Sequence, residues 1–339
     1  MKAACYHAPM DLTCEQTDRP ACQPTDVMVK VGACGICGSD LHFYKLGLFS
    51  EVLGRPTEKG LVPGHEFGGE VVEVGDQVQG ISVGDRVTGI AFGAMAEYVP
   101  ITPAILGFTV YKLPDEVSFD EAATVEPLST SYHATRLGEP VDGESAVVFG
   151  AGIIGLGIIQ SLKALDVKLK NLIVVDVSEK RLEMARQLGA THTVNPRSED
   201  IMVRAREITG EMGILVAPGM TTPAVDLVYD AVGYIKGIQG PPIIQQATEL
   251  VRDHGRVVVV GAFEGQVSVD LMPFLVKQVR IQGSYGYWPD QVIECIELIR
   301  NKKVDRMTLI THAFGLDQAK EAFDTQADSA GSIKVILKP

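Results

Sequence analysis

The sequence Val-Val-Phe-Gly-Ala-Gly-Ile-Ile-Gly, at residues 147–155, decides the fold. An apolar strand runs directly into a Gly-x-Gly-x-x-Gly turn, and an apolar segment with helical character follows. Twenty-one residues after Gly155, a second apolar strand ends on Asp176. A strand, a glycine turn, a helix and an acid in this order are typical of a dinucleotide-binding βαβ unit. The sequence therefore predicts that the chain binds a dinucleotide.

Each glycine of the turn has a separate expected role. Gly150 permits the tight turn, Gly152 lets the backbone approach a pyrophosphate, and Gly155 lets the helix pack close to the strand. The start of the helix offers free N–H groups and partial positive charge to the phosphates. The candidate cofactor contacts in this turn are Gly150, Gly152, Ile153, Ile154 and Gly155.

Asp176 favours NAD over NADP. A carboxylate at the end of the second strand can accept hydrogen bonds from the ribose hydroxyls, and it would repel a 2′-phosphate. Arg181 lies close enough in sequence to weaken this preference, and we include it among the cofactor-binding candidates. Further candidates lie where the fifth and sixth predicted strands end: Val260, Gly261, Ser284 and Tyr285.

Strand and helix patterns alternate from about residue 145 onwards, which predicts an α/β fold with a six-stranded parallel sheet covered by helices on both faces. The expected strands are 145–149, 172–176, 191–194, 226–230, 256–261 and 279–284. Two irregular stretches, 213–223 and 234–242, are expected to be loops.

The part of the chain before residue 115 is rich in glycine and short β runs, which predicts a small barrel-like β domain. Ser118 and Glu121 form a capping-box pattern that opens a helix. The last fifty or so residues hold two helices and a strand beyond the sixth Rossmann strand. We expect them to complete the first domain, so that residues 1–128 and 287–339 form one domain and 129–286 the other.

Composition narrows the class of protein. With 339 residues, 46% apolar and 22% charged, the chain has the make-up of a globular protein of about two domains. Its net charge of −13 argues against binding nucleic acid or an anionic membrane. No apolar run is long enough to span a bilayer, and the first residues lack a signal core. Five of the six cysteines fall in the first 37 residues, without a disulfide pattern. We expect a cytoplasmic protein.

Three separate blocks carry residues able to bind zinc: 35–42, 63–66 and 125–128. They supply a thiolate, an imidazole and carboxylates, and a catalytic zinc site keeps one position open for water or substrate. Because the blocks lie far apart, their spacing alone is a weak signal. A redox pair at Cys34 and Cys37 is a second interpretation, which the lack of a surrounding thioredoxin-like pattern disfavours.

The three blocks followed by the glycine turn resemble the zinc-dependent medium-chain dehydrogenase/reductase family over essentially the whole chain. The block Gly-Ile-Cys-Gly-Ser-Asp-Leu-His at 35–42 and Gly-His-Glu at 64–66 carry the resemblance. Glu-Pro-Leu at 126–128 is similar to the branch of sorbitol, butanediol and threonine dehydrogenases. This resemblance implies a GroES-like β-rich catalytic domain joined to a Rossmann domain. It also implies hydride transfer between a secondary alcohol or polyol and NAD.

The resemblance assigns roles residue by residue. Cys37 and His65 match zinc ligands, and Glu66 and Glu126 match two carboxylates between which the sequence does not choose. Asp40 matches the acid that orients the ligand histidine, which fixes its tautomer. Ser39 matches the hydroxyl that takes the substrate proton, and His42 matches the histidine that passes it on.

One departure from many relatives concerns residues 87–97, which contain no cysteine. A lobe with four cysteines that bind a structural zinc would fall there, so we expect one catalytic zinc only. The resemblance implies a homodimer or homotetramer acting on a small-molecule alcohol or ketone. The alternatives are a zinc-free quinone or enoyl reductase of the same superfamily and a non-catalytic dinucleotide-binding protein. The presence of Cys37, His65 and Ser39 argues against both.

Overall fold

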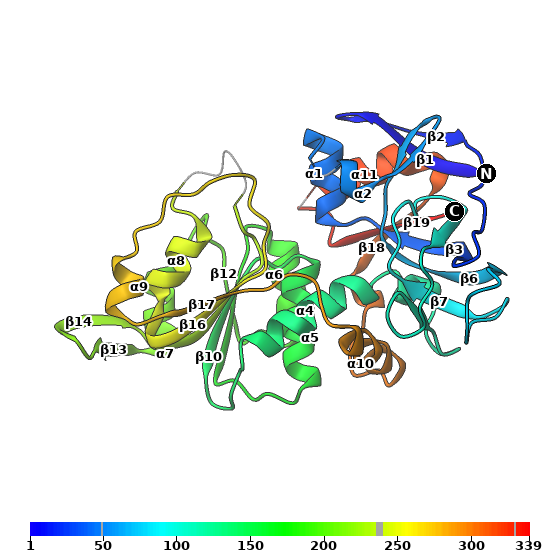
Figure 1. The fold of residues 1–339 in the computed structure, drawn as a ribbon. Helices are drawn as coiled ribbons and strands as arrows, with labels where there is room; N and C mark the ends of the chain where they lie inside the picture. The colour runs from blue at the N-terminus through cyan, green and yellow to red at the C-terminus, as the bar shows by residue number, and fades with distance from the viewer. Residues whose placement is uncertain (49, 235–239, 329) are drawn as a thin grey trace. The chain divides into compact units, whose positions relative to one another are not determined.

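The computed structural model describes residues 1–48, 50–234, 240–328 and 330–339. The chain forms two compact units, which we describe separately. Unit 1 consists of Met1–Pro127 and Trp288–Pro339, and unit 2 of Leu128–Tyr287. Both termini lie in unit 1 (Figure 1).

Unit 2 contains a six-stranded parallel sheet with the order β12-β11-β10-β15-β16-β17. The order reverses between β10 and β15, which is the arrangement of a doubly wound dinucleotide-binding fold. Its strands are β10 (Ser145–Phe149), β11 (Asn171–Val175), β12 (His192–Val194), β15 (Val225–Asp230), β16 (Val251–Val259) and β17 (Arg280–Gly283). The predicted α/β fold with a six-stranded parallel sheet is confirmed.

Helices cover both faces of this sheet, with α5 and α6 on one side and α7 and α8 on the other (Figure 1). The helices are α4 (Val125–Leu137), α5 (Ile153–Ala164), α6 (Glu179–Leu188), α7 (Ile201–Thr209), α8 (Ile243–Leu250) and α9 (Met272–Val276). Side-chain oxygens of Ser178 and Asp200 accept backbone N–H groups at the starts of α6 and α7. Both β10 and β11 are buried along their whole length, as strands covered on two faces must be.

The prediction of a loop at 213–223 is wrong. These residues belong to an antiparallel hairpin of β13 (Glu211–Ile214) and β14 (Ala217–Pro223), in which Glu211 pairs with Pro223. Glycine, proline and threonine in this stretch suggested irregular backbone, but cross-strand pairing outweighs intrinsic propensity. Of the other predicted loop, 234–242, residues 235–239 lie outside the described part of the chain.

Unit 1 is built on two sheets. The larger has the order β18-β19-β3-β6-β7-β9, with β8 also paired to β3, and the smaller has the order β2-β1-β5-β4. Its strands are β1 (Lys2–Ala8), β2 (Asp11–Gln16), β3 (Val27–Gly35), β4 (Arg55–Thr57), β5 (Gly60–Val62), β6 (Glu66–Val74), β7 (Arg86–Gly89), β8 (Tyr98–Ile101), β9 (Val110–Lys112), β18 (Ile310–Gly315) and β19 (Lys334–Lys338). The pairing of β19 with β3 ties the C-terminal segment to the N-terminal one.

Short helices complete unit 1: α1 (Gly38–Leu46), α2 (Ser50–Leu53), α3 (Phe119–Ala122), α10 (Pro289–Arg300) and α11 (Ala319–Ala327), with 3-10 turns at Met307–Leu309 and Leu316–Gln318. The predicted capping box is present, because the Ser118 hydroxyl accepts the Glu121 N–H and the Glu121 carboxylate accepts the Ser118 N–H. Within the described residues, no helix has both the length and the apolar character needed to cross a membrane.

Candidate metal centre and dinucleotide site

Cys37 lies at the N-cap of α1, where β3 ends and the helix begins. The Asp40 carboxylate, three residues into the helix, accepts the backbone N–H of Cys37 through Oδ2 at 2.9 Å. This contact fixes the first turn and orients the thiol. Asp40 is fully buried, so its position is set by the surrounding protein.

His65 directly precedes β6, and Glu66 is the first residue of this strand. Gly64 precedes them with φ of 99°, and a Cβ there would lie 2.6 Å from Met95 Cγ and 2.9 Å from Cys34 Sγ. Only glycine fits this position. The ligand atoms of Cys37, His65 and Glu66 all lie within 4.8 Å of one another, which makes them a candidate metal-binding group.

The second oxygen of Asp40 faces the ligand histidine. Asp40 Oδ1 lies 3.8 Å from His65 Nδ1, and both atoms are buried without a hydrogen-bond partner. Burial lowers the pKa of His65, but the charges of Asp40 and Cys37 outweigh this effect and raise the pKa overall. With Nδ1 directed toward Asp40, the other ring nitrogen is the one available to a metal.

Glu66 is held by a buried lysine that sequence reasoning missed. Lys334 Nζ donates to Glu66 Oε2 at 2.6 Å and to the Ile36 carbonyl at 2.7 Å, and both side chains are almost fully enclosed. Burial lowers the pKa of Lys334, yet the Glu66 charge raises it overall. A lysine within the otherwise apolar run 333–337 is the signal that could have revealed it. Gly35 leaves room for the carboxylate, because a Cβ there would lie 2.4 Å from Glu66 Oε2.

Arg306 adds a second buried positive charge on this side of the centre. Its Nε donates to Thr124 Oγ1 at 3.2 Å, and the side chain is fully buried. Burial lowers the pKa of Arg306 to about 10, and the charge of Glu66 acts against this fall. The sequence analysis did not identify this residue either.

Glu126 lies in the first turn of α4 and is outside the group of Cys37, His65 and Glu66. Its charge nevertheless contributes to raising the pKa of His65 and of Lys334, so it belongs to the same electrostatic environment. Of the two candidate carboxylates, Glu66 is the one with a ligand oxygen within 4.8 Å of the thiol and the imidazole.

The donor set fits a zinc ion. A thiol, an imidazole and a carboxylate are the usual zinc ligands in proteins. Glu66 Oε1 is buried without a hydrogen-bond partner, and an unpaired buried carboxylate oxygen is costly unless a cation satisfies it. Burial raises the pKa of the Cys37 thiol, and a bound metal would favour its thiolate form.

Ser39 and His42 lie on α1, two and five residues after Cys37. A separation of three residues places them on the same side of the helix. Both are partly exposed, whereas Asp40 between them is buried. The predicted proton-transfer residues are thus more exposed to solvent than Asp40, the acid on the same helix that faces His65.

The glycine turn of unit 2 has the geometry expected for a phosphate-binding turn. Gly150 has φ of 91°, and a Cβ on Gly155 would lie 1.8 Å from the Gly150 carbonyl oxygen. A Cβ on Gly152 would meet nothing closer than Arg181 Nη1 at 3.9 Å. Gly152 is also the N-cap of α5, which has no side-chain cap. The start of this helix therefore presents backbone N–H groups beside open space.

Asp176 links the turn to the second strand. Its Oδ2 accepts the Ala151 N–H at 2.7 Å, and its Oδ1 accepts the Ser178 N–H at 2.8 Å. Arg181, in the first turn of α6, extends its guanidinium toward Gly152. The structure therefore brings together the acid, the arginine and the glycine turn.

The remaining cofactor candidates lie at the carboxyl ends of β16 and β17. The N–H groups of Val260 and Gly261 both donate to the Asp230 carbonyl at 2.9 Å. The Ser284 hydroxyl is buried without a hydrogen-bond partner, whereas Tyr285 is fully exposed. Asp230 itself was missed: its Oδ1 accepts two backbone N–H groups, and its Oδ2 is buried without a partner. An acid as the last residue of an apolar strand was the available signal.

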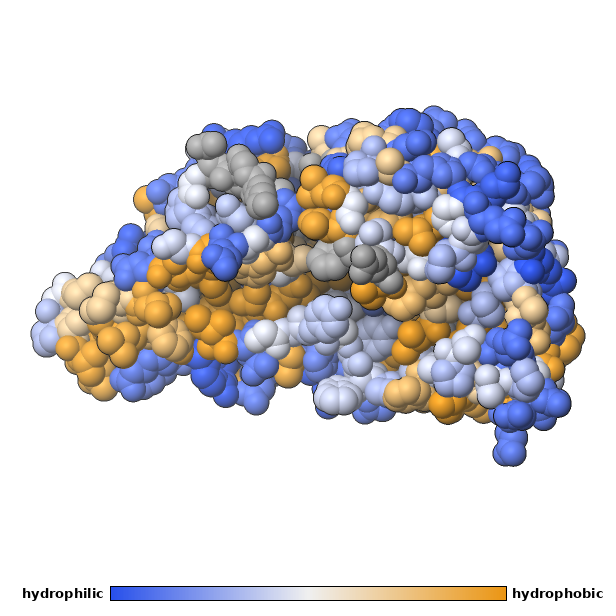
Figure 2. Space-filling model, turned by 45° about the horizontal axis from the view of Figure 1, so that its top comes forward, coloured by the Kyte–Doolittle hydropathy of each residue, from blue (hydrophilic) through white to orange (hydrophobic). Residues whose placement is uncertain are grey.

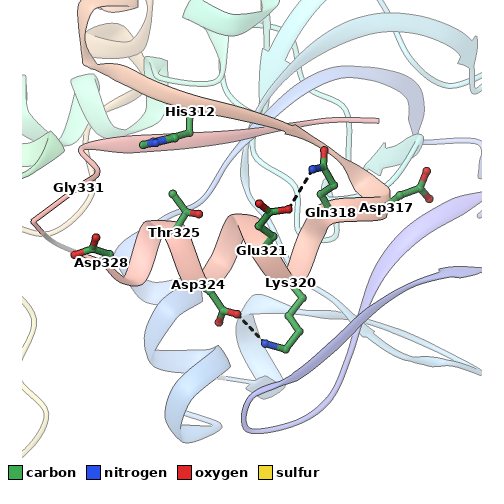
Figure 3. Close-up of a pocket in the computed structure, with 9 residues that line it drawn as sticks. All are labelled: His312, Asp317, Gln318, Lys320, Glu321, Asp324, Thr325, Asp328 and Gly331. Atoms are coloured by element: carbon green, nitrogen blue, oxygen red, sulfur yellow. Dashed lines mark hydrogen bonds and ion pairs between the residues drawn. The ribbon is translucent and has the colours of Figure 1, made fainter.

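A separate surface pocket lies on unit 1 along α11 and β18 (Figure 3). Four acidic side chains line it, and Lys320 and Gln318 there pair with Asp324 and Glu321. It contains none of the residues of the metal centre, and its exposed, mutually paired charges indicate a solvated surface.

Comparison with known proteins identifies the family of the chain. The family model described as "Alcohol dehydrogenase GroES-like domain" matches residues 23–115, and "Zinc-binding dehydrogenase" matches 154–301. A sorbitol dehydrogenase from Arabidopsis thaliana is 33% identical over 354 residues, covering 94% of this chain and 90% of the relative. The chain belongs to the zinc-type medium-chain alcohol dehydrogenase family. Its fold is the GroES-like catalytic domain with a Rossmann domain that the sequence predicted.

Two further relatives support this family assignment. The chain is 32% identical over 342 residues to a D-xylulose reductase from Saccharomyces cerevisiae, covering 93% of this chain and 91% of the relative. The crystal structure of 2R,3R-butanediol dehydrogenase from Bacillus subtilis superimposes with a TM-score of 0.83 at 29% identity, covering 100% and 99% of the two chains. These relatives are oxidoreductases of small alcohols, and this family membership identifies the chain as an oxidoreductase.

Proposed function

We propose that the protein is a zinc- and NAD-dependent dehydrogenase of secondary alcohols or polyols. The observation that carries the proposal is the cluster of Cys37, His65 and Glu66, whose ligand atoms lie within 4.8 Å of one another. The relatives named as sorbitol dehydrogenase, D-xylulose reductase and butanediol dehydrogenase support a small polyol or diol as substrate.

Cys37, His65 and Glu66 would hold the zinc, with Glu126 as the alternative carboxylate. Zinc bound by them would supply a Lewis acid that lowers the pKa of the substrate hydroxyl. The role of Asp40 is to hold His65 in one tautomer and to brace the backbone of Cys37. Lys334 donates to Glu66 Oε2 at 2.6 Å and so fixes the direction of this carboxylate.

Proton transfer is assigned to α1. Ser39 takes the hydroxyl proton of the substrate as the first acceptor, and His42 passes it on toward solvent. Their partly exposed positions on one side of the helix support this order, since a proton relay must end at water. A bound nicotinamide cofactor would supply the acceptor for the hydride of the carbon that bears this hydroxyl.

NAD is the proposed dinucleotide. Asp176 lies beside the glycine turn with both carboxylate oxygens engaged by backbone N–H groups, and its charge disfavours a 2′-phosphate. Gly150, Gly152, Ile153, Ile154 and Gly155 would contact the pyrophosphate. Arg181, Val260, Gly261, Ser284 and Tyr285 complete the proposed contacts.

One zinc per chain is proposed, without a structural zinc. Residues 87–97 carry no cysteine, and Gly93 and Ala94 instead donate backbone N–H groups to the Gly64 carbonyl at 2.9 and 3.0 Å. The backbone of the His65 loop therefore holds this segment, which supports the proposal of a single catalytic zinc.

A homodimer or homotetramer is also proposed. Figure 2 shows apolar surface gathered on the part of unit 2 that holds β13, β14 and α9. Its exposed apolar side chains are Leu215, Val216, Met220, Leu271, Met272 and Leu275. Exposed apolar patches of this kind mark association sites, and a second copy of the chain is the proposed occupant. None of the six cysteines, all of which the structure describes, forms a disulfide, which supports a reducing, cytoplasmic location.

The test is zinc content on protein purified without added metal, together with NAD reduction by a panel of secondary alcohols and polyols. We expect about one zinc per chain, and a chelator should remove the zinc and the alcohol-dependent NADH absorbance together. Full turnover in protein that holds no metal would show that the proposed centre is wrong. Equal turnover with NADP would contradict the role of Asp176.

A further inference from the structure

Asp230 is the last residue of β15, at the edge of the sheet where the strand order reverses. β15 lies between β10 and β16, and Asp230 is level with Phe149 on one side and with Val259 on the other. A dinucleotide binds outside the carboxyl ends of the strands at such a switch point. Asp230 therefore lies at the edge of the sheet that a bound cofactor would cover.

The side chain of Asp230 holds the loop after β15, which consists of residues 231–233. Its Oδ1 atom accepts the N–H groups of Val232 and Gly233 at 3.0 and 2.8 Å, which closes a tight turn directly after the strand. Its backbone carbonyl accepts the N–H groups of Val260 and Gly261, both at 2.9 Å, in the loop after β16. One residue therefore bonds to the loops that follow two neighbouring strands.

These two loops and the glycine turn are packed tightly against one another. A Cβ on Gly261 would lie 2.0 Å from the backbone nitrogen of Gly233. A Cβ on Gly150 would lie 2.9 Å from Val232 Cγ2. Because close-packed groups transmit strain, a shift of the loop after β15 would displace both the loop after β16 and the glycine turn.

Asp230 is too deeply buried to contact a cofactor itself. Its side chain is fully enclosed, whereas Val232, Val260 and Gly261 in the two loops are partly exposed. Asp176 differs, because it is partly exposed and bonds to the glycine turn directly. The loops can therefore offer backbone atoms to a ligand, and Asp230 can act on that ligand only through the loops.

We propose that Asp230 is a positioning residue of the dinucleotide site, which fixes the loops after β15 and β16 against the glycine turn in the arrangement that binds the cofactor. The inference rests on the proposed function in one respect, because it requires that unit 2 binds NAD. The role depends on the two hydrogen bonds that Oδ1 accepts and requires no negative charge. Burial raises the pKa of Asp230, which agrees with a carboxyl group that serves as an acceptor rather than as a charge.

The test compares two substitutions at Asp230 in the full chain. Asp230→Ala removes both hydrogen bonds to the loop, so NADH affinity, measured by fluorescence titration, should fall about tenfold. Asp230→Asn keeps an acceptor oxygen at the position of Oδ1, so NADH affinity should stay within about threefold of the wild type. An equal loss in the two variants would show that the charge, and not the bonds to the loop, is needed, and would overturn the proposal.

Steady-state kinetics adds a readout that a loss of folded protein alone would not give. In Asp230→Ala, the KM for NAD should rise about tenfold, while kcat at saturating NAD should stay within about threefold, because the zinc ligands and the proton-transfer residues lie in unit 1. A fall in kcat with unchanged KM would contradict a role in cofactor binding.

Asp226→Ala is the matched control. Asp226 lies near the opposite end of β15, where its Oδ2 accepts the Ser145 N–H at 2.8 Å and its Oδ1 accepts Arg252 Nε at 2.5 Å. Both alanine variants lose two hydrogen bonds to a carboxyl group, so both should unfold at a lower temperature than the wild type. Only Asp230→Ala should lose NADH affinity. An equal loss of affinity in Asp226→Ala would show a general effect of stability and would overturn the proposal.

NADH binding also separates this inference from the proposed function, because the titration requires no alcohol and no turnover. Unchanged NADH affinity in Asp230→Ala would overturn the role of Asp230, even where alcohols are oxidised and the proposed function holds. Weaker binding by Asp230→Ala, in a protein whose wild type oxidises no alcohol, would support the role of Asp230 and reject the proposed function. A wild type that binds no NADH would overturn both.

Discussion

The metal centre of unit 1 and the glycine turn of unit 2 are built in opposite ways. The turn is a single stretch, Val147–Gly155, which acts through backbone N–H groups and the space left by absent side chains. The centre joins three distant segments, because β6 and β19 both pair with β3 and so bring Glu66 and Lys334 to Cys37. A local motif can therefore be read from sequence, whereas a site assembled by sheet pairing needs the tertiary structure.

Two buried lysines show the same contrast. Lys334 in unit 1 bonds to a carboxylate, and the charge of Glu66 raises its pKa. In unit 2, the Lys277 ammonium donates to the carbonyls of Glu249 and Val251 at 2.7 and 2.6 Å, and burial lowers its pKa to about 8. Carbonyl dipoles at the end of α8 do not offset the loss of hydration, whereas a full negative charge does. The charge of the partner therefore decides the state of the lysine.

Replacing the thiol ligand should give the largest effect on turnover, and it should leave dinucleotide binding by unit 2 unchanged. Cys37→Ala removes a zinc ligand, so we expect alcohol-dependent NAD reduction to fall more than about a thousandfold, since Lewis-acid stabilisation contributes several kcal/mol. NADH affinity, measured by fluorescence titration, should stay within about twofold, because the turn lies in the other unit. Cys22→Ala, which changes a half-buried cysteine of unit 1 outside the cluster, is the control. Turnover within tenfold of the wild type in Cys37→Ala would refute the assignment.

Removing the lysine partner should destabilise unit 1 next most strongly. Lys334→Met leaves the buried Glu66 charge without its direct partner, which costs about 3 kcal/mol in metal-free protein. We expect this loss in urea unfolding followed by the fluorescence of Trp288, which lies in unit 1. Zinc should reduce the loss, because a cation beside Glu66 replaces the missing charge.

Two further variants make this result specific. The double variant Lys334→Met/Glu66→Gln removes both charges and should recover much of the stability, and a double variant no better than Lys334→Met would contradict the pairing argument. Lys338→Met serves as the matched control, because Lys338 on the same strand forms an exposed ion pair with Asp120 and should cost less than about 1 kcal/mol.

Substitutions at two glycines of the turn should have different effects: one should lower stability, and the other should lower NADH affinity. Gly155→Ala places a methyl 1.8 Å from the Gly150 carbonyl oxygen, and the overpacking should cost about 1–3 kcal/mol of stability. Gly152→Ala meets nothing within 3.9 Å, so thermal unfolding should barely change. Its methyl occupies the approach to the helix start, and we expect NADH affinity to fall about tenfold. Unchanged NADH affinity in Gly152→Ala would remove the turn from the proposed binding site.

Sequence reasoning predicted those parts of the fold whose signal is local. The six parallel strands and the capping box at Ser118 follow from hydrophobic pattern and side-chain caps. The β13–β14 hairpin was missed, because Thr221 and its neighbours lack a clear period and are held by pairing with 211–214. The alternation of apolar and polar side chains along one strand does not identify the strand that pairs with it in the sheet.

The candidate site shows the same limit. The resemblance assigned Cys37, His65 and the two glutamates, but it did not choose between Glu66 and Glu126. The structure brings Glu66 into the cluster, because β6 is paired with β3 along its length. Lys334 lies 268 residues from Glu66 in sequence. A contact between residues so far apart is not visible in a one-dimensional pattern.

The smallest predicted effect is on the pH dependence of stability, and it concerns Lys277. Its pKa is about 8 in the folded chain and about 10.5 when the side chain is hydrated. Between these values the unfolded chain binds more protons than the folded one, so the free energy of unfolding contributed by Lys277 rises with pH. Below pH 8 both states are protonated, and the folded chain carries the full cost of the buried charge. We expect a gain of about 1 kcal/mol from pH 7.5 to 10, because over this range the folded chain releases the proton and the unfolded chain largely keeps it.

Comparison with Lys277→Met isolates this contribution, since the other titrating groups are common to both proteins. Urea unfolding followed by circular dichroism at pH 7.5 and pH 10 should show the wild type gaining stability relative to the variant. A gain of the same size in both proteins would mean that Lys277 keeps its charge up to pH 10. The two buried lysines would then titrate alike, and the charge of the partner would not be what distinguishes the two regions.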